Sequence, residues 1–578
     1  MEMISRFVFL PLTICLLVIT FNEKLRRRVI AMKGIAALEN RLGGLERLYW
    51  LAFALIMAAG VFTRCYRFLE LPLGVNQDGT LAAAEAYCLA MDGTDQYGRS
   101  WPTYFEAWKF SQMSTLYSCL MIPFIKVLGL SKLTLRLPML LVSLAMLPLI
   151  WDFARRIAGK EFALCVLLIA ATSPWQILQS RWALEANLMP HVLLTGMYLL
   201  YLGREKRWAL YLSMVFFALT PYAYGVACFV TPVILVCAAA FYLARRKANV
   251  PDVIVCVLIF AGIAGPYFYT MLINALGLET AQMGPITMPF FEKSLRSNDM
   301  AFTQDNPYFQ MLWNLLPHLG TWLCLGTPAP YSALPWTHSV YLFMPPVFLV
   351  GIYSMWSKRR ALALRGEECP LRDGGMLLLI WLGAAMFCGL MIGGVINRNN
   401  AVFYPLMMLG GWTLYQMGKR LRTALALVVA MLVVSFGGLN VTYFTDEAYQ
   451  KTVGDSFHQG LYQALVDTWG WDYDRYYVLC LDDNAHKTFM TGSVMFAHQI
   501  DYSERNEDRE LDGPDGEPTG WYFTERYIFT DYRDFEPDPM ECAVYIIAQD
   551  QKNLFDPQDY LIKDYGIFAT VYPRYWAE

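Results

Sequence analysis

Residues 48–79 read "LYWLAFALIMAAGVFTRCYRFLELPLGVNQDG" and join an apolar run directly to a polar loop. The run from 48 to 66 has the length and composition of a transmembrane helix. The loop extends over residues 67–112 and carries Asp78 close to its start. This arrangement predicts a polar loop that is held at the surface of a membrane.

Similar apolar runs recur down to about residue 440. The chain of 578 residues is 56% hydrophobic and only 16% charged, whereas an ordinary soluble domain has about 25% charged residues. We therefore expect an all-α polytopic membrane protein with about eleven or twelve transmembrane helices. The expected spans are 48–66, 133–156, 161–175, 188–203, 206–221, 224–243, 250–270, 336–356, 376–395, 401–417 and 423–440, preceded by a weaker segment, 4–21.

Two segments are ambiguous. Segment 4–21 is either an uncleaved anchor or an additional helix. Its amino-terminal positive charge is limited to Arg6 and it lacks a small-residue cleavage site, so we do not expect a removed signal peptide. Segment 113–130 contains Lys126 and Gly129 and would break the alternation of the loops, so we expect a partly inserted or juxtamembrane helix.

Clusters of Lys and Arg mark the expected cytoplasmic loops, as the positive-inside rule requires. The remaining loops, and every candidate residue below, then lie on the extracytoplasmic side of a plasma membrane, most simply a bacterial one. The basic clusters are 24–28, 155–160, 204–207, 245–247, 358–372 and 419–422, and the outside segments are 67–112, 174–187, 271–335, 396–400 and the tail after 440.

The composition predicts three regions. Residues 1–47 form an amino-terminal helix and a basic cytoplasmic segment, 48–440 form the transmembrane domain, and 441–578 form a small extracytoplasmic α/β domain. The last region is polar and acidic and contains aromatic and β-branched runs such as "CAVYII". The net charge of −3 does not indicate a nucleic-acid partner. Most cysteines lie inside apolar runs and form no CxxC pair, so we predict no metal site and no disulfide framework.

Asp78 opens a predicted short helix, "DGTLAAAEAYCLAMDG". Glu85 lies two turns further along the same face. One interpretation makes Asp78 a catalytic carboxylate. The other makes it a helix N-cap in a solvated loop.

The segment "SPWQILQSRWALEANLMP", residues 173–190, connects two expected spans and carries Arg181 and Glu185. These residues are either an ordinary i,i+4 ion pair on a helix surface or functional charges close to the apolar zone, where charges are costly. The sequence favours neither interpretation.

Further cations lie at the same membrane edge. Arg136 in "LTLRLPMLL" either extends to the interface or faces a cavity. Arg398, beside Asn397 in "INRNNAVFYP", lies in a simple connector or in a turn suited to a phosphate. Arg64 and Arg67 are interface anchors or, less simply, phosphate ligands.

A carboxylate and several arginines on one side of a membrane suit a particular chemistry. A general base removes a proton from an attacking hydroxyl, and cations stabilise the charge of a departing phosphate. Together they predict group transfer from a phosphate-bearing lipid to a hydroxyl. A transporter would more often place ionisable residues at the bilayer midplane within related repeats, and we find no convincing repeat.

The order of these motifs resembles a known family. "LPLGVNQDG…YGRSWP", "LTLRLP", "FARRIAGK", "SPWQILQSRWALEANL" and "INRNNAVFYPLMMLGG" follow one another as in the bacterial protein-O-mannosyltransferase group, which includes the aminoarabinose transferases of lipid A. The resemblance covers roughly 48–440 and implies the GT-C fold, a polyprenyl-phosphate-linked sugar donor, inversion at the anomeric carbon and no nucleotide-sugar site. We expect no cofactor. The family has an Asp-Glu pair in its first outside loop, but Gly79 replaces the second acid here.

The resemblance implies roles for individual residues. Asp78 is the expected general base, and Arg136, Arg181 and Arg398 are expected to bind the donor phosphate. Glu85, Glu185, Asn397 and Arg67 are further candidates, and no metal is expected. The acceptor would be a hydroxyl on a protein, a membrane lipid or an envelope glycan. The alternatives are an oligosaccharide ligase or polymerase, a lipid or polysaccharide transporter, and a sensor or scaffold.

Overall fold

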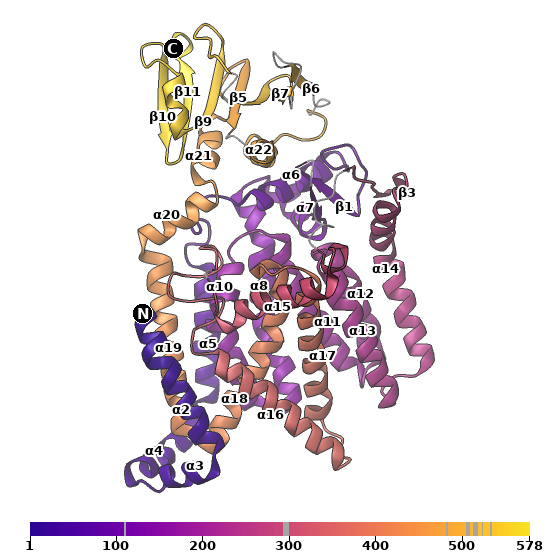
Figure 1. The fold of residues 1–578 in the computed structure, drawn as a ribbon, viewed down its shortest axis with the longest axis vertical. Helices are drawn as coiled ribbons and strands as arrows, with labels where there is room; N and C mark the ends of the chain where they lie inside the picture. Colours follow the sequence, from indigo (N-terminus) through magenta and orange to yellow (C-terminus); the bar gives the residue numbers. More distant parts are fainter. Residues whose placement is uncertain are drawn as a thin grey trace.

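The computed structural model describes the chain except for residues 109–110, 293–299, 327, 481–483, 505–508, 513–517, 523, 532–534 and 578. A bundle of helices forms one part of the molecule, and a domain with a β-sheet stands on one end of the bundle (Figure 1). Helix α6 (Gln77–Met91) lies between these two parts. The fold therefore places the start of the first polar loop at the junction of bundle and domain.

Seven helical stretches in the described residues are long and apolar enough to cross a membrane. The predicted polytopic α-helical architecture is thus confirmed, although several predicted spans correspond to helices that are shorter or less apolar. The seven are Glu2–Phe21, Lys33–Cys65, Lys132–Ala158 (α8), Ala227–Ala244 (α13), Val250–Leu276 (α14), Pro370–Met391 (α17) and Arg422–Thr445 (α19).

The remaining helices complete the bundle and its edges. Helix α7 is a short apolar helix in the region where we predicted a juxtamembrane segment. Helix α15 lies across the bundle rather than along it (Figure 1). Helix α5 (Tyr49–Cys65) is the second half of the stretch Lys33–Cys65. The remaining helices are α7 (Leu116–Leu128), α9 (Lys160–Thr172), α10 (Pro174–Gln179), α11 (Glu185–Gly203), α12 (Arg207–Ala223), α15 (Pro307–Leu323), α16 (Pro345–Leu364), η5 (Ile396–Val402) and α18 (Phe403–Arg420).

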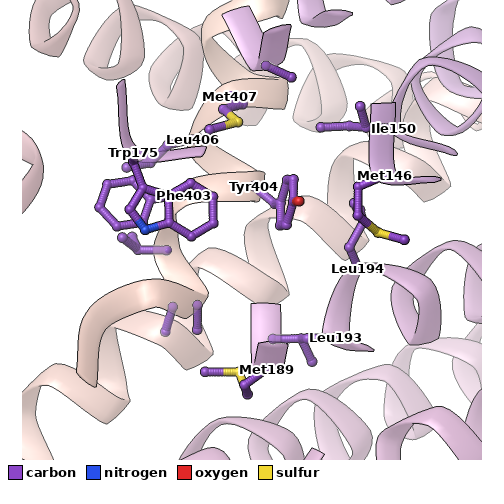
Figure 2. Close-up of a cluster of buried hydrophobic side chains, with 14 of the residues drawn as sticks. Met146, Ile150, Trp175, Met189, Leu193, Leu194, Phe403, Tyr404, Leu406 and Met407 are labelled. Atoms are coloured by element: carbon purple, nitrogen blue, oxygen red, sulfur yellow. The ribbon is translucent and has the colours of Figure 1, made fainter. Parts of the chain in front are cut away.

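The core of the bundle lies directly beneath the polar loops. The Trp175 ring stacks on Phe403, with ring centroids 4.6 Å apart and planes 20° apart, and both side chains lie beside Tyr404 (Figure 2). The Tyr404 hydroxyl accepts a hydrogen bond from Nε2 of Gln176 at 3.0 Å and is 2.8 Å from Nδ1 of His191. These partners satisfy a phenol that would be costly to bury alone. The stacked rings fix α10 against α18.

The amino-terminal segment folds against the bundle. It comprises α1 (Glu2–Ile4), η1 (Ser5–Phe9), α2 (Leu10–Phe21), α3 (Glu23–Ile30), α4 (Lys33–Gly43) and η2 (Gly44–Leu48). The Phe9 ring meets Phe343 edge to face at 5.7 Å. At the other end of α2, Arg422 donates to Glu46 at 2.9 Å and Lys419 pairs with Glu161 at 2.6 Å. Two of the basic clusters thus gather near α4, at the end of the bundle opposite the sheet domain (Figure 1).

The carboxy-terminal domain is an α/β unit, as we predicted. Its seven-stranded sheet has the order β10-β11-β9-β5-β8-β7-β6, and β5 pairs in parallel with both β8 and β9. Both faces of the sheet are covered, which explains why β9, "AVYIIA", is apolar throughout. The elements are α20 (Glu447–Ser456), α21 (Gln459–Thr468), β5 (Arg475–Cys480), α22 (Asn484–His498), β6 (Arg509–Asp512), β7 (Pro518–Tyr522), β8 (Tyr527–Asp531), β9 (Ala543–Ala548), β10 (Tyr560–Tyr565) and β11 (Phe568–Pro573).

The domain packs on α6. Gly492 of α22 lies so close to Leu81 that a Cβ at residue 492 would be 2.9 Å from the Leu81 Cα. The hydroxyls of Thr80 and Ser493 are 3.2 Å apart. Near the other end of α6, Asp92 accepts a hydrogen bond from the Tyr502 backbone N–H at 3.1 Å. The domain therefore contacts both ends of α6.

His498 makes the domain sensitive to acid. Its Nε2 donates to the Leu465 carbonyl at 2.8 Å, and its Nδ1 accepts from the Tyr527 hydroxyl at 2.6 Å. Burial, aided by the positive charge of Arg526, lowers the pKa of His498 to about 4. In the unfolded chain the pKa of histidine is about 6.5, so between about pH 6.5 and pH 4 only the unfolded state binds this proton.

We predict that the domain loses stability as the pH falls through this range. Hydrogen exchange of α22, corrected for the intrinsic rate, should show less protection at pH 5 than at pH 7. His498→Gln removes the titrating group and should flatten this dependence. An equal loss of protection in the variant would show that another group is responsible.

Candidate active site

Asn76, and not Asp78, caps α6. The Asn76 side chain accepts a hydrogen bond from the Asp78 backbone N–H at 2.9 Å. The interpretation of Asp78 as an N-cap is therefore wrong, because a single residue that precedes the helix already fills this role. Asp78 lies in the first turn of α6 and is half-buried. The helix dipole favours a negative charge at this position.

Gly79 explains the missing second acid. A Cβ at residue 79 would lie 2.9 Å from the carbonyl oxygen of Ala183, closer than real side chains approach. The first turn of α6 therefore packs directly against the turn between α10 and α11. A carboxylate at position 79 would require this contact to open. The departure from the family's Asp-Glu pair thus has a steric counterpart in this chain.

Aromatic side chains from three segments surround this turn. Trp182 contacts Tyr331, with ring centroids 5.5 Å apart, and Phe457, at 5.0 Å. Burial and the negative charge of Asp78 raise the pKa of Tyr331. The Tyr331 phenol therefore stays protonated at neutral pH, and its pKa shows that it lies within the electrostatic influence of Asp78. Sequence reasoning missed these three residues because they are ordinary aromatics in segments that are distant along the chain.

Arg181 is enclosed by backbone carbonyls. It is 0% exposed. Its Nη1 donates to Thr63 and Arg64, at 2.7 and 3.1 Å, and its Nη2 donates to Tyr66 and Arg67, at 2.8 and 3.0 Å. Its Nε donates to the Tyr443 hydroxyl at 3.1 Å. All three nitrogens thus brace the chain where it leaves α5.

Arg136 braces the next residues in the same way. Its Nη1 donates to the Phe68 carbonyl at 3.2 Å, and its Nη2 donates to Pro72 and Gly74 at 2.8 and 2.9 Å. The side chain is 1% exposed. These contacts favour a structural role for Arg136 and Arg181 over the predicted binding of a phosphate. Together the two arginines hold the segment that leads into α6.

Arg64 and Arg67 are also occupied by the protein. Arg64 is buried and donates to the Ser143 hydroxyl at 3.1 Å and to the Gly60 carbonyl at 2.7 Å. Arg67 pairs with Glu70 at 2.6 Å and donates to the Phe444 carbonyl at 2.8 Å. Arg67 thus ties the end of α5 to the end of α19.

Glu85 and Glu185 hold loops. Glu85 is 0% exposed and accepts hydrogen bonds from the backbone N–H and the Nε2 of Gln96, at 3.0 and 2.5 Å. Glu185 accepts from the Ser114 backbone N–H. Helix α11 begins only at Glu185, and Arg181 lies in the preceding turn, so the two residues do not share the i,i+4 geometry of a surface helix. The ion-pair interpretation assumed a helix that is not there.

Arg398 and Asn397 lie in η5, which packs on the start of α11. Asn400 of the same element donates to the Ala186 carbonyl at 3.1 Å and accepts from Nε1 of Trp175 at 2.8 Å. Arg398 is half-buried and donates to the Gly393 carbonyl at 3.5 Å. The Asn397 side-chain oxygen is buried and has no hydrogen-bond partner in the described part of the chain. Helix α11 contacts both η5 and α6, so it connects this turn to the helix that carries Asp78.

The turn beside Gly79 also carries buried amides whose hydrogen-bonding capacity is unused. Within the described ranges, both side-chain polar atoms of Gln179, Oδ1 of Asn187 and Nε1 of Trp182 have no hydrogen-bond partner. These three side chains are at most 3% exposed. Buried polar atoms of this kind can be satisfied by water or by a bound ligand. Their sequence signal was weak because uncharged polar residues occur in many connections.

No metal site is evident in the described residues, which contain no group of three or more His, Cys, Asp or Glu side chains placed to hold an ion.

The comparison with known proteins supports the fold. No protein-family model matches the sequence, and no curated protein matches it. ArnT from Cupriavidus metallidurans, an aminoarabinose transferase solved with bound undecaprenyl phosphate, is 14% identical with a TM-score of 0.54, over 92% of this chain and 99% of that chain. This likeness shows that the chain has the predicted GT-C fold.

Two further solved structures are more distant. The Archaeoglobus fulgidus oligosaccharyltransferase, in complex with Zn and sulfate, is 12% identical with a TM-score of 0.46, over 78% of this chain and 62% of that chain. The arabinosyltransferase EmbB from Mycobacterium smegmatis is 12% identical with a TM-score of 0.31, over 80% and 45% of the two chains.

We predict that Arg181→Gln destabilises the protein by roughly 3 kcal/mol or more, because several buried carbonyls lose their donor. Thermal unfolding in detergent, beside the exposed control Arg41→Gln, measures this loss. The folded fraction of each variant is then titrated with undecaprenyl phosphate. If Arg181→Gln has normal stability but has lost affinity for undecaprenyl phosphate, Arg181 binds the phosphate and the structural role is wrong.

Proposed function

We propose that the chain is an integral membrane glycosyltransferase that moves a sugar from a polyprenyl-phosphate-linked donor to an acceptor hydroxyl, with Asp78 as the general base. The observation that carries this proposal is the position of Asp78. Asp78 is half-buried in the first turn of a helix at the end of a membrane bundle, and the next residue, Gly79, packs against the turn between α10 and α11.

The fold supports a lipid-linked donor. The ArnT structure with this fold contains undecaprenyl phosphate. In the present chain the segment from α5 to α6 is short, so Asp78 lies close to the end of a membrane span. A phosphate at the head of a membrane lipid lies at the same level. A soluble nucleotide sugar would not need a site at this position.

The distribution of basic residues supports an extracytoplasmic site. The clusters around Lys419, Arg422 and α3 lie at the end of the bundle away from the sheet domain (Figure 1). The positive-inside rule assigns that end to the cytoplasm. Asp78 and the carboxy-terminal domain then face the outside, as we predicted from the sequence.

The reaction balances with one base and one leaving group. Asp78 accepts the proton of the acceptor hydroxyl, and the hydroxyl oxygen forms a bond to the anomeric carbon. The bond from this carbon to the phosphate oxygen breaks, and the polyprenyl phosphate departs with the bonding electrons. Attack from the face opposite to the phosphate inverts the anomeric configuration.

Arg136 and Arg181 contribute indirectly to this reaction. Because their nitrogens bond to the backbone of residues 63–74, they fix the path that leads to Asp78. Of the three arginines predicted to bind the phosphate, we retain Arg398, which is half-buried in a turn that packs on α11. Its charge would stabilise the departing phosphate.

The uncharged turn beside Asp78 suits the sugar better than the phosphate. Gln179 offers an amide donor and an acceptor, Asn187 offers an acceptor, and sugar hydroxyls both donate and accept hydrogen bonds. Trp182 adds an aromatic face and an indole N–H. We assign these three residues to the binding of the transferred sugar.

Asp78→Asn should abolish turnover while the protein stays folded and inserted, because an amide cannot accept the proton. Purified protein in nanodiscs is supplied with a panel of radiolabelled polyprenyl-phosphate sugars and an envelope extract, and release of label from the lipid is followed. The matched control is Asp92→Asn, the same change at the other end of α6, where the amide oxygen still accepts from Tyr502. Undiminished release by Asp78→Asn would exclude the base. Lipid movement without a new glycosidic bond would indicate a transporter.

Gln179→Leu and Asn187→Leu should lower kcat/KM for the preferred donor by about 10–100-fold, because each removes a hydrogen bond made in a buried site. Affinity for undecaprenyl phosphate without a sugar should not change. The exposed Gln463→Leu on α21 provides the control for the same chemical change. A parallel loss of affinity for the lipid phosphate would place the amides at the phosphate instead.

A further inference from the structure

A cavity of about 590 Å³ lies away from Asp78, where the amino-terminal helices meet the bundle. Its walls come from the first residues of the chain, from Gly326 and residues 328–342, which precede α16, and from the junction of α19 and α20. The amino terminus lies beside α19 (Figure 1). The wall thus includes Glu2 and Arg6, at the start of the segment Glu2–Phe21, which is long and apolar enough to cross a membrane.

His338 lines this cavity, and one of its ring nitrogens is buried without a hydrogen-bond partner in the described residues. The residue is 5% exposed. Its Nε2 is 2.7 Å from the Gly326 carbonyl, and a carbonyl only accepts, so this nitrogen carries the proton. Its Nδ1 is then an acceptor, and this buried atom has no partner in the described residues. Burial and the charge of Arg6 lower the pKa of His338, so the acceptor persists at neutral pH.

The mouth of the cavity is charged with both signs. Arg6 pairs with Glu2 at 2.9 Å, and these side chains are 53% and 49% exposed. Asp446 also lines the cavity, and one of its oxygens caps α20 through the Tyr449 N–H at 3.1 Å. An exposed ion pair contributes little to stability, so a ligand can exchange with it. The mouth therefore offers one cation and two carboxylates.

The rest of the lining is apolar. Trp336, Leu342 and several prolines form this part of the wall. A charged mouth next to an apolar wall, beside a membrane-spanning segment, suits an amphiphile whose head remains at the interface. The excess of carboxylates over cations disfavours a head group that carries only negative charge. A head with a phosphate and an ammonium group matches both signs.

We propose that this cavity binds the head group of a zwitterionic aminophospholipid. Arg6 binds the phosphate, and the ammonium group donates to Nδ1 of His338 and to the carboxylates of Glu2 and Asp446. The acyl chains lie along the amino-terminal helix in the bilayer. This site is separate from the proposed transfer reaction, and its existence does not depend on that reaction.

The bound lipid would also support the segment that reaches Asp78. Pro330 lines the cavity, and its carbonyl accepts a hydrogen bond from the Tyr449 hydroxyl at 3.0 Å. The next residue, Tyr331, is the aromatic side chain whose pKa the charge of Asp78 raises. The head group therefore packs against one side of a loop whose other side faces the candidate active site.

Native mass spectrometry of the full chain in detergent tests the proposal, with added phosphatidylethanolamine or phosphatidylglycerol. Arg6→Gln removes the cation. His338→Gln removes the acceptor at Nδ1 and keeps an amide N–H that reaches Gly326. Each variant should lose affinity for phosphatidylethanolamine by about tenfold, the effect of one hydrogen bond to a charged group. Arg28→Gln, an exposed cation at the other end of the amino-terminal helices, should bind as the unaltered chain does.

Three outcomes would overturn the proposal. The first is equal retention of phosphatidylethanolamine by all variants, which indicates lipid bound only around the bundle. The second is equal or tighter binding of phosphatidylglycerol, which indicates that the ammonium group is not recognised. The third is lost binding that accompanies a lowered unfolding temperature in both Arg6→Gln and His338→Gln, which indicates a structural role.

Discussion

Two buried guanidinium groups govern the route of the chain out of the first strongly apolar span. Arg181 and Arg136 donate to backbone carbonyls between Thr63 and Gly74, a stretch that comprises the last residues of α5 and the turns that follow it. Carbonyls in such a place have little water to bond, and each one left unpaired is costly. The arginines satisfy these carbonyls, and the position of α6 follows. Asp78, the contact at Gly79 and the docking surface for the sheet domain all depend on that position.

Because Arg136 and Arg181 bind backbone carbonyls, their positive charges are enclosed by the protein. The arginines nearest to Asp78 are enclosed by carbonyls, so what the turn beside Gly79 offers a ligand is mostly neutral: amides, an indole and a phenol. A neutral surface selects hydroxyl-rich groups by hydrogen-bond pattern, and a charged one would select by attraction alone. The proposed division, with the sugar at this turn and the phosphate nearer to Arg398, follows from that difference.

The sequence predicted the architecture well, but it did not reveal the contacts that the candidate site residues make. Long apolar runs predict membrane-length helices directly. The apolar run in β9 similarly indicates a strand that is buried on both of its faces. The caps and clamps were harder to predict. Asn76 and Asp78 are equally good helix caps by residue type. In the sequence, an arginine that binds backbone carbonyls also cannot be distinguished from one that binds a phosphate. The partners that decide between these roles, such as Thr63, Tyr443 and Ala183, become neighbours only after folding.

The seating of α6 has a mechanical consequence. A helix of this kind rises about 1.5 Å per residue, so the fifteen residues of α6 form a stiff rod of about 22 Å. The sheet domain contacts one end of this rod through Tyr502 and the other through Gly492 and Ser493. A tilt of about 3° around the far end would move Asp78 by about 1 Å, an error that can cost about a hundredfold in rate. By contacting both ends of α6, the sheet domain would thus hold the carboxylate of the proposed base in position.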